Sequence, residues 1–212
     1  MSALYDAVLT GDATAAAEAV RQGLESGAAP LDLVEREMVP AMDEVGRRFG
    51  CEEYFVPDLL LAARAMKTAM EQIRPLLAAS GAHSAGRVIV GTVKGDLHDI
   101  GKNIVASMLE GGGFEVIDLG IDVPPQTFVE AVRRSSPDLV CLSALLTVTM
   151  TAMKSTIEAL QAADLRDKAK VLVGGAPVTQ RFADEIGADG YGENAVAAVT
   201  LARRLMEARQ PA

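Results

Sequence analysis

Hydrophobic residues in the first 80 positions recur every three to four residues, which is the spacing of one face of an α-helix. Asp12 can cap a helix that follows it, and Pro57 fits the first turn of another, where its missing N–H costs nothing. The pattern predicts an N-terminal bundle of four antiparallel helices over residues 1–80. The helices starting at Pro30 and Pro57 show it most clearly, through Leu33, Val34, Met38, Met42, Val45 and Phe49, then Leu59, Leu60, Ala63, Met66, Met70 and Ile73.

Small, uncharged residues interrupt this pattern just after the fourth predicted helix. We expect residues 81–86 to form a linker between two domains. His83 lies in this segment, and we expect it to be exposed and without a role.

Beyond residue 86 the pattern changes to apolar runs that alternate with amphipathic segments. This alternation predicts a parallel sheet with helices on both faces, and five strands suggest the flavodoxin-like, Rossmann-type order 2-1-3-4-5. The chain is therefore predicted to be α + α/β, with a cap at 1–80, a linker at 81–86 and an α/β domain at 87–212. The predicted strands are 87–93, 114–118, 138–143, 170–174 and 189–191, and the predicted helices are 99–111, 125–135, 150–162, 178–186 and 194–208.

Composition narrows the possible functions of this 212-residue chain. A net charge of −9 and the absence of tryptophan argue against nucleic acid as a partner. No apolar stretch is long enough to span a membrane, and the first residues lack the basic and apolar regions of a signal peptide. Cys51 and Cys141 stand far apart without metal-ligand neighbours, so we expect both to be packing residues in a cytoplasmic protein.

Ligands of open parallel sheets bind beyond the carboxyl ends of the strands, so the loops that follow the predicted strands were compared. They concentrate small residues and hydroxyls, with no cluster of lysines or arginines and no glycine fingerprint for a phosphate-rich nucleotide. Gly174 and Gly175 have two readings. They either leave room for a flat ligand or form a tight turn from strand to helix.

The loop after the first strand, GDLHDIGKNIV at 95–105, carries His98, one of only two histidines. Asp96 lies two residues earlier, where its carboxylate can bond one ring nitrogen and leave the other as a metal ligand. A single protein nitrogen suits a metal already held by a macrocycle, because a bare zinc ion needs three or four ligands. Haem fits this reasoning too. In the simpler reading, Asp96 or Asp99 caps a helix and His98 is incidental.

These motifs resemble the cobalamin-binding signature shared by methionine synthase and related corrinoid proteins. The resemblance rests on Asp96-x-His98-x-x-Gly101, Ser143-x-Leu145 and Gly174-Gly175. It extends to MDEVGRRFG and YFVPDLLLAARAMKTAM, which are similar to the helical cap of methyl-transferring members, and covers roughly residues 30–205. The stretch VGGAPVTQRFADEIGADGYGENA is most similar to stand-alone corrinoid proteins of methylamine, methanol, methoxyarene and betaine methyltransferase systems.

The resemblance assigns roles to individual residues. It implies that His98 is the lower axial ligand of cobalt, replacing the cofactor's own benzimidazole (base-off, His-on), with Asp96 bonded to it and Thr149 extending the relay. In the cap, Phe49, Val56 and Leu59 would shield the methyl-bearing face of the cofactor. The other cofactor-binding residues would be Gly95, Leu97, Asp99, Ile100 and Gly101 in the first loop, then Ser143, Leu145, Thr147, Gly174, Gly175, Tyr191, Gly192 and Glu193.

The implied function is a methyl carrier rather than a stand-alone catalyst. Its corrinoid would cycle between Co(I) and methylcobalamin, receiving a methyl group from a substrate-specific methyltransferase. A second methyltransferase would pass that group to an acceptor such as tetrahydrofolate or coenzyme M, and a reductive activating protein would rescue oxidised cobalt. The sequence identifies neither the donor nor the acceptor, the native lower base or the oligomeric state.

Three alternatives belong to different classes. The first is the cobalamin-binding part of an adenosylcobalamin-dependent mutase, which would share the His98 motif but needs no methyl-shielding cap. A cobalamin-binding regulator or light sensor would normally carry a DNA-binding or signalling module, for which the sequence shows no sign. The third is a flavodoxin-like module without a corrinoid. Neighbouring genes for a substrate methyltransferase would separate the methyl carrier from all three.

Overall fold

The computed structural model describes residues 2–80 and 85–208. Residues 81–84, which include His83 and most of the predicted linker, lie outside the described residues. The chain divides into two compact units. Unit 1 comprises residues 1–85 with 107–114, and unit 2 comprises 86–106 with 115–212. The domain boundaries expected at residues 80 and 87 stay a prediction.

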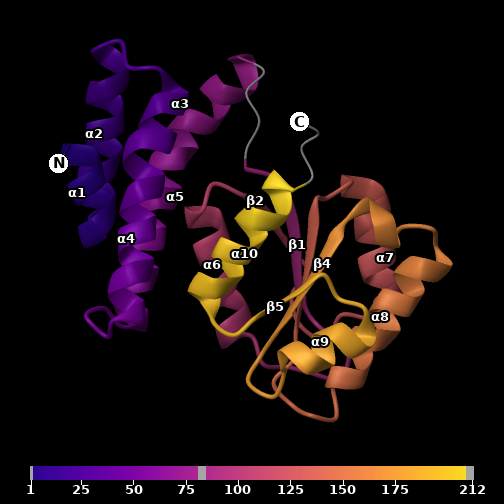
Figure 1. The fold of residues 1–212 in the computed structure, drawn as a ribbon. Helices are drawn as coiled ribbons and strands as arrows, with labels where there is room; N and C mark the ends of the chain where they lie inside the picture. The colour runs from indigo at the N-terminus through magenta and orange to yellow at the C-terminus, as the bar shows by residue number, and fades with distance from the viewer. Residues whose placement is uncertain (1, 81–84, 209–212) are drawn as a thin grey trace. The chain divides into compact units, whose positions relative to one another are not determined.

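Unit 1 is helical, as its hydrophobic periodicity predicts (Figure 1). Ser2 and Asp12 begin the first two helices by accepting hydrogen bonds from the backbone N–H groups of Tyr5 and Ala15. These bonds satisfy donors that a helix start leaves without a partner. The elements are α1 (Ala3–Thr10), α2 (Ala13–Glu25), α3 (Pro30–Leu33), the π-helical turn η1 (Val34–Met38), α4 (Val39–Gly50) and α5 (Val56–Ser80).

The third predicted helix differs from the expectation, because a π-helical turn at Val34–Met38 separates α3 from α4. Pro40 lies at the start of α4 and has no N–H to donate to the carbonyl of Arg36. A missing bond of this kind loosens the regular ladder and favours a local change of helical pitch. The hydrophobic spacing predicted the helix but could not register this change, since each residue still falls near its expected face.

Large apolar side chains fill the interior of unit 1. Eight examples among them are no more than 2 % exposed, and burying a side chain of this size contributes about 1.5–3 kcal/mol. This core explains why short helices, which are marginal alone, are stable here. These residues are Leu4, Val8, Val20, Met38, Val45, Leu59, Met66 and Ile73.

Unit 2 contains a five-stranded parallel sheet in the order β2-β1-β3-β4-β5. This is the predicted order 2-1-3-4-5, and the flavodoxin-like fold class is confirmed. The strands are β1 (Arg87–Thr92), β2 (Glu115–Asp118), β3 (Leu139–Ser143), β4 (Lys170–Gly174) and β5 (Gly190–Gly192). The helices are α6 (Ile100–Gly111), α7 (Pro125–Ser135), α8 (Met150–Ala162), α9 (Gln180–Ile186) and α10 (Ala195–Glu207), with a short 3-10 turn η2 (Arg166–Lys168).

Helices cover both faces of the sheet. Residues of α7, α8 and α9 share one hydrophobic cluster with the sheet, and Figure 1 shows α6 and α10 on the opposite face. Phe128 of α7 is fully buried, and a Cβ on Gly91 of β1 would lie 2.7 Å from its ring. The glycine in a central strand is therefore explained by the aromatic ring that packs over it.

Two further expectations have mixed outcomes. Cys141 is buried in β3 as a packing residue, but Cys51 is exposed beyond the end of α4, so the expectation of packing was wrong there. Burial raises the pKa of the Cys141 thiol to about 12, which makes it unreactive. Within the described ranges, no helix is both long and apolar enough to cross a membrane.

An ion cluster joins the amino-terminal edge of β4 to the segment before β5. Asp189 accepts hydrogen bonds from the Val171 N–H at 2.8 Å and Lys170 Nζ at 2.9 Å, and it pairs with Arg166 at 2.7 Å. Burial alone would raise the pKa of Asp189, but these partners outweigh it and hold the pKa below its usual range.

We predict that Asp189→Asn lowers the stability of unit 2 at neutral pH by about 1–3 kcal/mol. A carboxylate with a depressed pKa stabilises the fold above its ordinary pKa, and this contribution is lost as the pH falls through the folded pKa. The gap between variant and parent should therefore narrow in acid, as measured by urea unfolding at neutral and acidic pH. Asp167→Asn, an exposed neighbour, is the matched control. Equal stability of Asp189→Asn and the parent at neutral pH would contradict the prediction.

Candidate functional site

The ends of four strands lie in one row across the sheet. Thr92 of β1 pairs with Ser143 of β3, Ser143 pairs with Gly174 of β4, and Gly174 pairs with Gly192 of β5. This register brings the loops after the strands to the same edge. The site residues predicted in the α/β domain therefore gather at the carboxyl end of the sheet.

Asp96 lies at the centre of this edge and is fully buried. Its Oδ2 accepts hydrogen bonds from the N–H groups of Leu145 and Leu146, at 2.7 and 3.3 Å, and from Thr149 Oγ1 at 2.6 Å. These three donors belong to the loop between β3 and α8. One carboxylate oxygen thus holds together two loops that are about 50 residues apart in the sequence.

The other carboxylate oxygen of Asp96 holds His98. Asp96 Oδ1 accepts the His98 backbone N–H at 3.0 Å and lies 2.7 Å from His98 Nδ1. From this geometry we assign the hydrogen of the neutral imidazole to Nδ1, which leaves a lone pair on Nε2. The His98 side chain is 50 % exposed, and Nε2 has no hydrogen-bond partner among the residues of 2–80 and 85–208. It is a fixed nitrogen whose lone pair is available for coordination.

Hydrogen bonding dominates the electrostatics of Asp96. Burial disfavours the charged form and would raise the pKa of this carboxyl group. The bonds from Thr149 and from the N–H groups of His98 and Leu145 outweigh that effect and hold the pKa well below its usual range. Asp96 is therefore an anion at neutral pH and keeps a proton on His98 Nδ1.

Two side chains that the sequence analysis did not single out also belong to this edge. Asp122, between β2 and α7, accepts the Gly95 N–H at 2.7 Å. Lys102 in the first turn of α6 is buried and pairs with Asp118 at the end of β2. The position of Asp122 in a loop gives no periodic pattern from which its contact could be predicted. For Lys102, the available sign in the sequence was a charged residue on the side of a predicted helix that faces the sheet.

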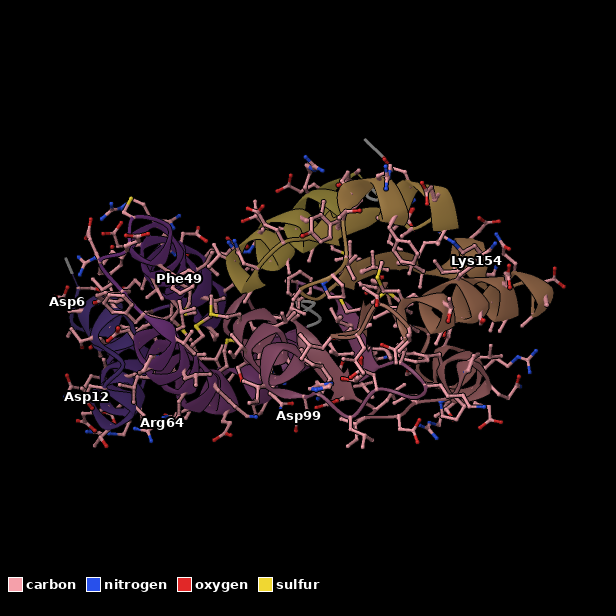
Figure 2. All side chains as sticks on the ribbon, turned by 90° about the horizontal axis from the view of Figure 1, so that it is seen from below. Asp6, Asp12, Phe49, Arg64, Asp99 and Lys154 are labelled. Atoms are coloured by element: carbon pink, nitrogen blue, oxygen red, sulfur yellow. The ribbon has the colours of Figure 1, made fainter. Side chains whose placement is uncertain are left out.

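Large apolar side chains are exposed at this edge. Leu97, Ile100 and Val148 are 67, 76 and 75 % exposed, and they come from the loops after β1 and β3 and the start of α6. Asp99, labelled in Figure 2, immediately precedes α6 and accepts a hydrogen bond from Asn103. Apolar side chains this exposed indicate a surface that a ligand or partner covers. Further exposed members are Ile121, Leu145 and Leu146.

Glycine is present at positions 175 and 101 of the motif for different physical reasons. A Cβ on Gly175 would lie 1.8 Å from the Ala144 carbonyl oxygen, and its φ is +128°, so the chain's own packing requires glycine there. This supports the tight-turn reading of that position. Gly101 has helical geometry with open space around its Cβ position, although glycine weakens a helix. Its own fold gives no reason for glycine, which suits a ligand passing close to the backbone.

The remaining predicted residues of unit 2 lie beside this centre. Ser143 and Tyr191 are partly buried, and Tyr191 packs against the core on the α7–α9 face. Thr147 and Glu193 are exposed. A Cβ on Gly192 would lie 3.0 Å from Ala198, so close packing with α10 accounts for this glycine. Their contacts with a cofactor remain predictions.

The three predicted cap residues belong to unit 1 and differ in exposure. Phe49 is partly buried in the last turn of α4 (Figure 2), and Val56 is 39 % exposed at the start of α5. Leu59 is 1 % exposed, so its side chain serves the core of unit 1. A shielding role for these residues stays a prediction.

The donor set and surface of this edge fit a corrinoid. No group of three or more histidine, cysteine, aspartate or glutamate residues in the described chain could hold a bare metal ion. One free imidazole nitrogen suits a metal whose other ligands come from a macrocycle. The exposed side chains of Leu97, Ile100 and Val148, together with the open space beside Gly101, suit a large ring with a tail.

Comparison with known proteins agrees with this assignment. A family described as "B12 binding domain" matches residues 86–200, and a second of the same description matches residues 2–74. Trimethylamine corrinoid protein 1 of Methanosarcina acetivorans is 45 % identical, covering 95 % of this chain and 94 % of the relative.

Two solved structures extend the comparison to three dimensions. A cobalamin-binding protein from Desulfitobacterium hafniense is 36 % identical with a TM-score of 0.81, covering 96 % of this chain and 97 % of its own. The methanol:cobalamin methyltransferase complex of Methanosarcina barkeri contains a chain that is 30 % identical with a TM-score of 0.84. That match covers 97 % of this chain and 78 % of the solved one. Both the site and its relatives place the chain in one family: it belongs to the B12-binding corrinoid proteins.

Proposed function

We propose that this chain is the methyl carrier of a corrinoid-dependent methyltransferase system. It receives a methyl group from a substrate-specific methyltransferase and presents it to a second methyltransferase that serves an acceptor such as tetrahydrofolate or coenzyme M. The observation that carries the proposal is the His98 imidazole, with Nδ1 held by a buried carboxylate and Nε2 free. The names of the relatives support it, since one is a trimethylamine corrinoid protein and another belongs to a methanol:cobalamin methyltransferase complex.

The residues at the sheet edge would hold the corrinoid. His98 would supply Nε2 as the lower axial ligand, while Gly101, Gly174 and the loop after β3 would border the nucleotide tail. When bound, the corrinoid supplies a cobalt centre that accepts and releases a methyl group. The exposed apolar side chains of Leu97, Ile100 and Val148 would help to keep water away from this centre.

Asp96 and Thr149 position the ligand. Asp96 remains an anion and keeps the proton on Nδ1, so the lone pair stays on Nε2. Thr149 Oγ1 lies 2.6 Å from Asp96 Oδ2 and 2.8 Å from the Leu146 carbonyl oxygen. It can therefore orient the carboxylate from the side opposite His98.

The partners belong to the proposal as well. A relative that belongs to a methanol:cobalamin methyltransferase complex supports a carrier served by separate enzymes. A substrate methyltransferase, an acceptor methyltransferase and a reductive activating protein complete the system. Methylamines are the first donors to test, because of the trimethylamine corrinoid relative.

The first prediction concerns the axial ligand. The parent reconstituted with methylcobinamide, a corrinoid that lacks the benzimidazole base, should show the visible spectrum of nitrogen-ligated cobalt. His98→Ala should lose the nitrogen-ligation bands, because neither this corrinoid nor another described side chain offers a nitrogen at this position. His83→Ala, which removes the other histidine, is the control and should match the parent. A His98→Ala spectrum identical to that of the parent would rule out the axial role.

The second prediction concerns Gly101. Gly101→Ala should stabilise the chain without cofactor by about 0.5–1 kcal/mol, since alanine favours the helix and its Cβ meets open space. The same variant should bind cobalamin more weakly, as measured by spectroscopic titration. Gly50→Ala, another helical position with open space, should leave the affinity unchanged. Unaltered affinity of Gly101→Ala would show that the ligand does not approach this residue.

The third prediction concerns the methyl donor. Corrinoid-loaded chain should be methylated by a purified methylamine methyltransferase and its amine, followed by the change in visible absorbance. Methanol, methoxyarene and betaine systems complete the panel. The methyl-carrier proposal fails if every partner methylates free cobalamin but none methylates the loaded chain.

A further inference from the structure

Asp122 is joined to the residues that carry the axial-ligand turn, without touching His98. Its Oδ1 accepts the Gly95 N–H at 2.7 Å, and its own N–H donates to the Asp96 carbonyl oxygen at 3.0 Å. Two bonds from one residue thus hold the main chain of two consecutive residues. The Asp96 side chain is held independently by the loop after β3.

The backbone of Asp122 indicates that its side chain is needed. Its φ is +52°, in the left-handed region that costs most residues about 1–2 kcal/mol and that glycine adopts freely. Aspartate tolerates this region better than most residues do, but glycine would remove the strain entirely. The observed bond from Gly95 is what an aspartate provides here and a glycine would lack. Gly95 is itself left-handed, with φ +84°, and turns its N–H toward the carboxylate.

Further backbone hydrogen bonds hold the loop that carries Asp122 in place. Thr92 and Val123 extend the pairing of β1 beyond the end of β2, through Thr92 N–H to Gly120 at 3.0 Å and Val123 N–H to Thr92 at 3.0 Å. A single parallel bridge joins Val93 to Val123. Thr92 Oγ1 also donates to the His98 carbonyl oxygen at 3.0 Å. Asp122 therefore lies in a segment that is hydrogen-bonded to β1. The turn that it bonds is itself held at both ends, at Val93 and at His98.

We propose that Asp122 is a positioning residue for the axial ligand, acting through the backbone of Gly95 and Asp96 to keep His98 Nε2 aimed at the metal. This inference rests on the proposed function. The Asp122 carboxylate bonds Gly95, the residue immediately before Asp96. Losing this carboxylate would let the turn rotate while the carboxylate of Asp96 stays buried. The effect is a change in how often His98 coordinates, not a loss of the fold.

The experiment compares Asp122→Gly and Asp122→Asn with the parent. Asp122→Gly keeps the left-handed backbone free of strain and removes only the acceptor. Asp122→Asn keeps an acceptor oxygen and should restore most of the parent's behaviour. Asp164→Gly is the matched control, because Asp164 is also left-handed, with φ +57°, and its side chain makes no hydrogen bond to the described residues. Thermal unfolding of the cofactor-free proteins checks that all variants fold.

Two readouts are used. Histidine ligation is read from the cobalt(II) form by electron paramagnetic resonance in protein labelled with ¹⁵N-histidine, since the label distinguishes imidazole from the cofactor's own base. Cobalamin affinity is read by titration. Asp122→Gly should show a smaller His-ligated fraction and about tenfold weaker binding, the equivalent of one charge-assisted hydrogen bond. Asp164→Gly should match the parent in both.

A double-mutant cycle with His98→Ala separates positioning from damage to the pocket. If Asp122 acts through His98, then Asp122→Gly should not weaken binding further once His98 is absent. Equal weakening in both backgrounds, or an Asp122→Gly variant ligated like the parent, overturns the inference while the axial role of His98 stands. A parent protein without labelled-histidine coupling overturns the proposed axial role and this inference with it.

Discussion

The buried carboxylate of Asp96 is the interaction on which the site depends. Its two oxygens collect hydrogen bonds from the turn after β1 and from the loop after β3. A buried charge is tolerated only when it is well bonded, so the two loops must come together for unit 2 to fold. The same bonds orient His98, because Oδ1 serves both its backbone and its ring. Folding of the sheet edge and orientation of the His98 ring are therefore one event.

The sheet makes this convergence possible. Parallel strands carry their following loops to one edge, and the row from Thr92 to Gly192 sets those loops side by side. Residues distant in sequence then come into contact, as where Thr149 Oγ1 lies 2.6 Å from Asp96 Oδ2. The apolar side chains around them are unusually exposed, which a fold alone does not explain. The site residues thus lie in the loops, while the pairing of the strands sets how those loops align.

The fold and the centre of the site could be predicted from sequence because both depend on local spacing. Alternating apolar runs predicted the strand order, and the two-residue step from Asp96 to His98 predicted their bond. Long-range partners left no such trace. The bond from Gly95 to Asp122 spans 27 residues, and the buried Lys102 of α6 pairs with Asp118 at the end of β2. Leu59 is buried on its helix, and periodicity alone does not separate a core position from a ligand-facing one.

The exposed yet anchored imidazole of His98 has a thermodynamic consequence. A free histidine would lose rotational freedom on coordinating a metal, and that entropy would oppose binding. Here Asp96 fixes the ring and the backbone N–H together, so the loss falls on folding of the polypeptide rather than on capture of the cofactor. Under the proposed axial role, the cofactor therefore meets an imidazole that folding has already ordered.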